Sequence, residues 1–188
     1  MKTTKTILFA MLIGIITVSC RKEPATPINE EELITTMILT AQKLGTTTVQ
    51  NFVFNDPDGG GGIAPTIDSL ILDKAAQYDF TITLLNIQAT PADTISNEVL
   101  EEGDVHQFFY QSIANTVLSG FSYQDTDING KPIGLAFRLN TSNLGGSGKL
   151  KIILRHQPNK SGANVSNGDI TNADGETDVE VDFPFRLQ

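Results

Sequence analysis

Strict alternation of apolar and polar residues is the feature of this sequence that most constrains its fold. The alternation is clearest at the end of the chain, in TDVEVDFPFRLQ (residues 177–188). Successive side chains of an extended strand point to opposite faces, so one set should face a core and the other solvent. The predicted core set is Val179, Val181, Phe183, Phe185 and Leu187. The predicted solvent set is Asp178, Glu180, Asp182 and Arg186. Pro184 has no N–H for a ladder bond and predicts an edge strand.

The same period of two recurs along the chain, for example in YDFTITLLNI (residues 78–87) and GKLKIILRH (residues 148–156). Further segments of this kind span residues 33–42, 47–54, 69–73, 106–111, 117–123 and 133–141. Residues 93–104 instead place Ile95, Val99 and Leu100 on one side, which predicts a short helix or a loop. Many short strands with Gly, Asn and Asp turns predict an all-β fold, an antiparallel, immunoglobulin-like β-sandwich of about 7–9 strands.

The first residues are typical of an export signal. Lys2 and Lys5 precede a mostly apolar run, Ile7–Val18, that is too short to span a bilayer. The segment TVSC resembles a bacterial lipoprotein signal box, in which Ser19 precedes a cysteine that is lipidated, here Cys20. A plain secretory signal or an anchor helix are the alternatives. Cys20 is the one cysteine of the chain, so it cannot form an internal disulfide.

These features predict three segments. Residues 1–19 are a signal peptide that is removed, residues 20–30 are a lipid-anchored tether containing Pro24 and Pro27, and residues 31–188 are one β-sandwich domain. Two acyl chains on Cys20 would suffice for stable membrane anchoring. We therefore expect a monomeric domain held at the outer membrane of the cell envelope, on its periplasmic or its surface face.

The net charge of the chain limits the classes of molecule that it is expected to bind. It is −9, and loss of Lys2 and Lys5 would make the chain more negative still. Such a chain repels phosphate backbones and anionic headgroups, which argues against nucleic-acid binding and direct binding of lipid headgroups. Cations, and partners with basic patches, fit this charge better.

Motifs of catalysis are scarce, and we predict that the protein is not an enzyme and has no catalytic residues. GGSGK (residues 145–149) lacks the leading glycine and the following Ser or Thr of a phosphate loop. The chain has no G-x-S-x-G elbow. Lipidation would also remove Cys20 from the candidate nucleophiles.

One turn has the spacing of calcium ligands. QDTDINGKPIG (residues 124–134) places Asp125, Asp127 and Asn129 as in the first half of a calcium loop, but Ala136 stands at the twelfth position, where a glutamate is needed. Asn129 followed by Gly130 is also a strong hairpin signal. Both interpretations, a plain turn and a weak calcium site, stay open.

The two histidines suggest a transition-metal site. His106 begins a predicted strand just after Glu101, Glu102 and Asp104, whereas His156 ends another strand. If the two strands are antiparallel neighbours, both imidazoles lie on one rim, where a carboxylate would complete a site for zinc or a similar ion. The alternative is two unrelated histidines that bind turns. No cofactor is established by the sequence, and calcium and zinc are the candidates.

Several segments resemble those of a family of small Gram-negative outer-membrane lipoproteins. They are EEELITT, FNDPDGG, DVHQFFY, DTDINGKPIGL, LRHQPNK and GDITNADGETDVEVDFP. Proteins similar to these are sometimes labelled as type 1 periplasmic binding folds, a two-lobed α/β architecture that a short, strand-rich chain does not predict. Similar lipoproteins work beside TonB-dependent transporters. The resemblance therefore implies a binding or accessory module beside such a transporter. The alternative is a structural or adhesion domain with calcium-stabilised turns.

Replacing the predicted lipidation site tests the anchor. Cys20→Ala is expected to abolish incorporation of a fatty-acid probe, because the thiol is the attachment atom, and to release the protein from the membrane fraction. Metabolic labelling followed by fractionation measures both. Label that persists in Cys20→Ala would show that the lipid is attached elsewhere.

Overall fold

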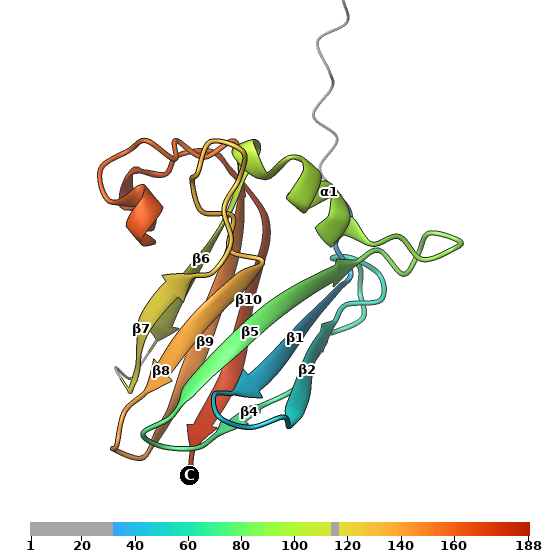
Figure 1. Cartoon of the computed structure of the whole chain (residues 1–188). Helices are drawn as coiled ribbons and strands as arrows, with labels where there is room; N and C mark the ends of the chain where they lie inside the picture. Colours follow the sequence, from blue (N-terminus) through green and yellow to red (C-terminus); the bar gives the residue numbers. More distant parts are fainter. Residues whose placement is uncertain (1–31, 114–116) are drawn as a thin grey trace, which may run out of the picture. The chain divides into compact units, whose positions relative to one another are not determined.

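The computed structural model describes residues 32–113 and 117–188, which form two packed β-sheets (Figure 1). The predicted signal peptide, Cys20 and the tether lie outside the described residues. The six-stranded sheet contains, in spatial order, β3 (Thr66–Ile67), β2 (Val49–Asn55), β1 (Thr36–Lys43), β5 (Gln77–Leu85), β8 (Ala136–Thr141) and β7 (Leu118–Tyr123). The four-stranded sheet contains β4 (Leu70–Leu72), β10 (Glu176–Leu187), β9 (Gly146–His156) and β6 (His106–Ile113). The prediction of an all-β sandwich is confirmed.

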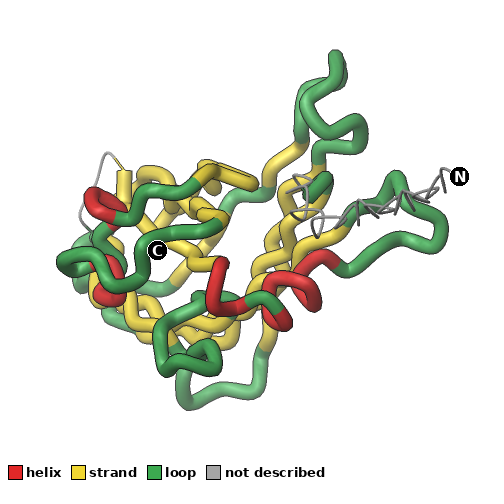
Figure 2. The backbone as a smooth tube through the Cα atoms, turned by 90° about the horizontal axis from the view of Figure 1, so that it is seen from above, coloured by secondary structure: helices red, strands yellow, loops and turns green. Residues whose placement is uncertain are grey.

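Short helices complete the domain. α1 (Ile95–Glu101) and the 3₁₀ turn η1 (Gly103–Val105) occupy the segment predicted as a short helix. Two further 3₁₀ turns, η2 (Val165–Asn167) and η3 (Ile170–Asn172), lie between β9 and β10. Figure 2 looks down on the end of the sandwich where these helices gather.

The core forms between the two sheets from the residues that the alternation selects. Phe80 of β5 stacks on Phe137 of β8 at a centroid distance of 4.9 Å, and Phe137 stacks on Tyr110 of β6 at 3.9 Å. The column of rings therefore joins one sheet to the other. Each large apolar side chain buried in this way contributes about 1.5–3 kcal/mol. A smaller cluster of Phe109, Ile153, Val165 and Ala173 packs on the outer face of the four-stranded sheet.

The position of β10 in its sheet differs from the predicted one. It lies between β9 and β4, so the predicted edge position is wrong. The reason is that β4 pairs in parallel with Phe185–Leu187 only. Pro184 precedes this pairing, so its missing N–H interrupts no bond to β4. The other named strand pairs are antiparallel, and β3, a strand of two residues, had no predicted counterpart.

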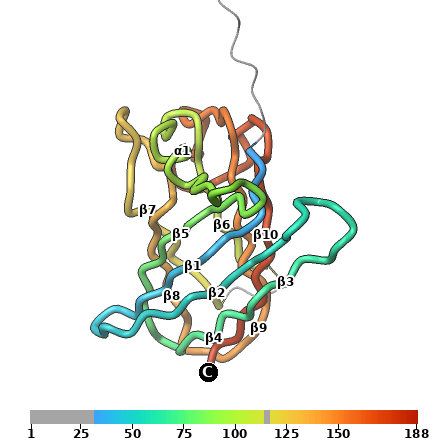
Figure 3. Tube along the Cα trace, turned by 90° about the vertical axis from the view of Figure 1, so that its right-hand side faces the viewer, coloured from blue at the N-terminus to red at the C-terminus, as the bar shows by residue number. Residues whose placement is uncertain are grey.

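One end of the sandwich collects several chain segments. β1, β6 and β10 begin there, β9 ends there, and α1 lies above the strands (Figure 3). We call it the α1 end. The candidate site lies here.

Candidate metal centre

His106 and His156 are direct neighbours across β6 and β9. Their Cα positions pair in the antiparallel register, and their ring centroids are 4.6 Å apart. His106 continues the inward set Phe108 and Tyr110, and His156 continues Leu154, so both imidazoles close the core at the α1 end. His106 is fully buried and His156 is 9% exposed. The sequence predicted this shared rim, whereas metal binding itself stays a prediction.

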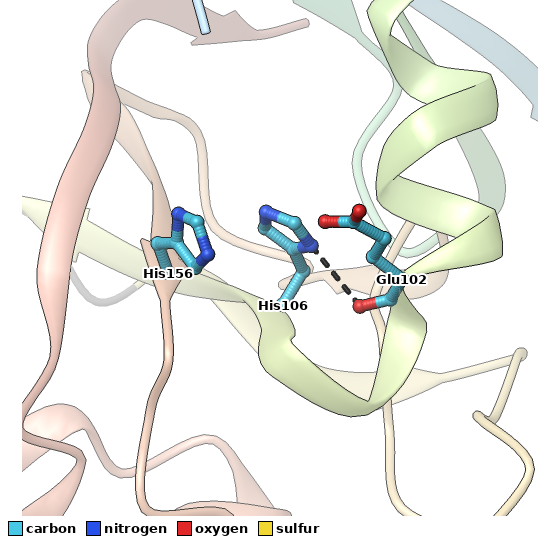
Figure 4. Close-up of side chains that lie close together, drawn as sticks. All are labelled: Glu102, His106 and His156. Carbon is cyan, nitrogen blue, oxygen red and sulfur yellow. Dashed lines mark hydrogen bonds between the residues drawn. The ribbon is translucent and has the colours of Figure 1, made fainter. Parts of the chain in front are cut away.

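Glu102 joins the two histidines (Figure 4). One ligand atom each from Glu102, His106 and His156 lie within 4.8 Å of one another. Glu102 follows α1 directly and is exposed, whereas the two imidazoles are buried. Glu101 and Asp104, the other predicted carboxylates, are exposed and lie outside this group. Glu101 is the last residue of α1, whereas Glu102 has left the helical conformation (φ −97°, ψ 32°), so the two side chains take different directions.

The hydrogen bond of His106 determines which of its ring nitrogens carries the proton. Its Nδ1 lies 3.1 Å from the backbone oxygen of Glu102, and a carbonyl oxygen can only accept, so Nδ1 carries the proton. Nε2 then presents a lone pair, is buried, and has no hydrogen-bond partner among the described residues. Burial lowers the pKa of His106, which keeps the ring neutral. A metal-binding histidine has this arrangement, with the second ring nitrogen donating to a carbonyl.

Asp178 is the site residue that the sequence analysis placed wrongly. Its side chain is 2% exposed, with Oδ1 3.7 Å from His156 Nδ1 and Oδ2 3.8 Å from His106 Nε2. The alternation predicted that Asp178 faces solvent. The register of β10 against β9 shifts between Thr177 and Val179, and this irregularity turns Asp178 toward the histidines.

The spacing of these atoms suits an ion between them. Separations of 3.7 and 3.8 Å are too long for hydrogen bonds. Two ligand atoms about 2.0–2.2 Å from a tetrahedral metal ion stand about 3.4 Å apart, so small side-chain movements would close the site. Neutral His106 and the carboxylate of Asp178 both present lone pairs, which a cation would bridge.

Two more carboxylates surround the centre. Burial raises the pKa of Glu32 to about 7, and the negative charges of Glu98, Asp178 and Glu102 and a hydrogen bond with Glu98 raise it further in the same direction. Glu98 and Glu102 are four residues apart at α1, a spacing that places like charges side by side. The spacing of Glu98 and Glu102 could have been recognised in the sequence as a pair of neighbouring carboxylates. Nothing in the sequence indicates that Glu32, which is far away along the chain, lies beside them.

The predicted calcium turn is organised by protein groups. Asp125 accepts hydrogen bonds from the backbone N–H groups of Gly134 and Ala136. Asp127 Oδ1 accepts from the N–H groups of Asn129 and Lys131. These contacts are those of turn residues.

A buried lysine supplies the positive charge at this turn. Lys160 Nζ donates to Asp127 Oδ2 at 3.0 Å, to the backbone oxygen of Pro132 at 2.8 Å, and to that of Gly103. Both side chains of the ion pair are buried, with exposures of 6% and 1%. The ammonium group is the counter-charge of Asp127, and its contact with Gly103 ties the segment after β9 to η1.

Comparisons with protein-family models, with curated proteins and with solved structures gave no match, so the function has to be inferred from the site itself. No helix in residues 32–113 and 117–188 has the length and apolar character needed to span a membrane.

Breaking the buried ion pair should destabilise the fold. Asp127→Ala leaves the Lys160 ammonium buried without its counter-charge, and we expect a loss of about 3–5 kcal/mol in the free energy of unfolding. Asn129→Ala in the same turn is the control, because its side chain is exposed. Urea denaturation measures both variants. A loss restricted to the calcium-loaded protein, and equal for both variants, would instead favour a calcium site.

Glu32 should make the metal-free domain less stable as the pH rises. Its pKa is about 7 in the folded state against 4.5 in the unfolded chain. Between these values the folded state holds the extra proton, so stability decreases with rising pH up to about 7. The melting temperature should be lower at pH 8 than at pH 5.5, with a smaller difference in Glu32→Gln. An identical pH profile for both proteins would contradict this.

Proposed function

We propose that this protein is a metal-binding module in which His106, His156, Glu102 and Asp178 hold one divalent transition-metal ion. The observation that carries the proposal is His106: a buried neutral ring whose Nδ1–H is used by a carbonyl and whose Nε2 faces a carboxylate at 3.8 Å. Two imidazoles and two carboxylates would supply the four protein ligands of a tetrahedral site.

The donor set selects the class of metal. Calcium and magnesium prefer oxygen ligands alone, whereas imidazole nitrogen suits zinc, copper, iron and nickel. Zinc is the first candidate because it accepts both nitrogen and carboxylate ligands in a tetrahedral site. The surrounding carboxylates of Glu32 and Glu98 add negative potential that concentrates cations at the α1 end.

The proposed role is capture of the ion in the cell envelope. The lipid-anchored tether proposed for residues 20–30 precedes Glu32 closely in the chain, and Glu32 lies beside the centre. About 11 residues of semi-extended chain reach roughly 35 Å from the bilayer at about 3.1 Å each. Supply of the ion to a TonB-dependent transporter would fit the resemblance stated above, and binding rather than catalysis is the proposed activity.

Zinc titration of the metal-free protein tests this function. Isothermal titration calorimetry is expected to show one site, and His106→Ala, His156→Ala and Asp178→Asn should each weaken it by more than about 100-fold, because outer-shell changes alone cost 10–100-fold. Saturating zinc should also raise the melting temperature, by the equivalent of about 2.7 kcal/mol at 100 times Kd.

Glu101→Ala is the matched control for these variants. It removes one negative charge from the same helix, but Glu101 lies outside the group of ligand atoms. We expect its zinc affinity to stay within about threefold of the wild type, as for an exposed charge screened by solvent. Absence of zinc binding by the wild type, or equal losses in Glu101→Ala and His106→Ala, would refute the site.

A further inference from the structure

A cavity apart from the proposed metal centre lies on the domain between β6, β7 and η2. The cavity holds about 240 Å³ and is lined by aromatic rings, by the backbone of β7 and by Asn167 and Gly168. None of its lining residues belongs to the metal centre. The volume equals roughly eight water molecules at about 30 Å³ each, which is room for one small ring.

The backbone conformation of β7 creates this cavity. The pairing of β7 with β8 shifts register between Ser119 and Ser122, and Gly120 within that irregularity has φ +59°. A Cβ atom on Gly120 would stand 2.1 Å from Asn140 Nδ2, so the close approach needs glycine. Gly168, at φ +93°, ends η2 on the opposite wall. Both walls are therefore built features of the chain and not gaps in loose packing.

One wall of the cavity is formed by aromatic rings that are held in place and turn an apolar surface toward the cavity. Tyr110 and Phe121 are nearly parallel, with centroids 6.0 Å apart, and Tyr123 lies 6.1 Å from Tyr110. Both hydroxyl groups are used inside the protein. Tyr110 donates to the backbone oxygen of Gly134, and Tyr123 donates to that of Phe108 at 2.6 Å and accepts from Gln107. The rings are thus held in place, with their apolar surface left for a ligand.

The other wall is polar and uncharged. Ser122 and Asn167 are exposed residues of the lining, and Asn167 brings an amide with both donor and acceptor atoms. No Asp, Glu, Lys or Arg is among the lining residues described. A charged ligand would lose its hydration without gaining a counter-charge. A purely aromatic ligand would contact the rings but would make no hydrogen bonds with Ser122 or Asn167.

We propose that this cavity binds one neutral sugar ring, such as a single pyranose unit. The C–H face of the sugar would pack on Phe121 and Tyr123, and its hydroxyl groups would exchange hydrogen bonds with Asn167 and Ser122. A sugar ring has an apolar face and a polar rim, and the cavity has both walls. The site is independent of the metal centre and requires no ion.

Nuclear magnetic resonance titration of the full domain in EDTA tests the proposal, with glucose, galactose, mannose and N-acetylglucosamine as separate probes. At up to about 50 mM, well above a millimolar Kd, at least one sugar should shift the amide signals of Gly120, Ser122, Asn167 and Gly168 in a saturable way. Asn167→Ala should weaken that sugar about tenfold, the effect of one or two lost hydrogen bonds.

Phe121→Leu keeps the apolar volume but removes the aromatic face, and should weaken the same sugar several-fold. Asn97→Ala, an exposed change on α1, is the control and should leave the titration unchanged. Circular dichroism of each variant excludes unfolding. The proposal is overturned if no sugar shifts these signals, if the shifts lie away from the cavity, or if phenol saturates them while no sugar does.

Discussion

The register between β6, β9 and β10 is the constraint on which the proposed metal site depends. His106 pairs with His156, and His156 pairs with Glu176, so three strands align their ends within one residue. A slip of one residue would turn each side chain to the other face of the sheet and separate the imidazoles. The apolar residues behind them hold the register, because Phe108, Leu154 and Val181 would have to leave the core in any slipped pairing. The same strand register therefore determines both the packing of the core and the positions of the proposed metal ligands.

The sequence was sufficient to predict the elements that obey a simple period. Alternation identified all of the longer strands and the inward direction of Phe183 and Phe185, because a half-buried strand has no other way to hide apolar residues. The position of the two histidines on one rim followed from where their strands begin and end. The inward face of a strand and the positions of its ends are local properties, so a short sequence pattern is enough to predict them.

The other features of the site depend on strand irregularities and on contacts between distant segments, which a local sequence pattern does not reveal. Asp178 faces inward because one residue is added to the ladder, and the surrounding letters alternate without interruption across that point. Glu32 reaches the centre through the path of the chain before β1, and the parallel pairing of β4 with β10 joins segments over a hundred residues apart. In the same way the aromatic cavity exists because β7 is irregular at Gly120. Irregularities of strands therefore shape both of the sites proposed for this domain.

The electrostatics of the α1 end also bear on whether an ion would be structural or exchangeable. The core between the sheets is closed by Phe108, Leu154 and Val99, which are fully buried, so protein groups cover the apolar surface at this end. The negative charges of Glu98 and Glu102, by contrast, raise the pKa of Glu32, and a cation at the rim would offset their repulsion of the Glu32 carboxylate. An ion would therefore relieve strain that is confined to the rim. Glu102 is exposed, whereas His106 and His156 are buried, so solvent reaches the proposed ligands mainly at Glu102. A site that lies at the rim of a packed sandwich, and whose outermost ligand is exposed, is suited to an ion that enters and leaves.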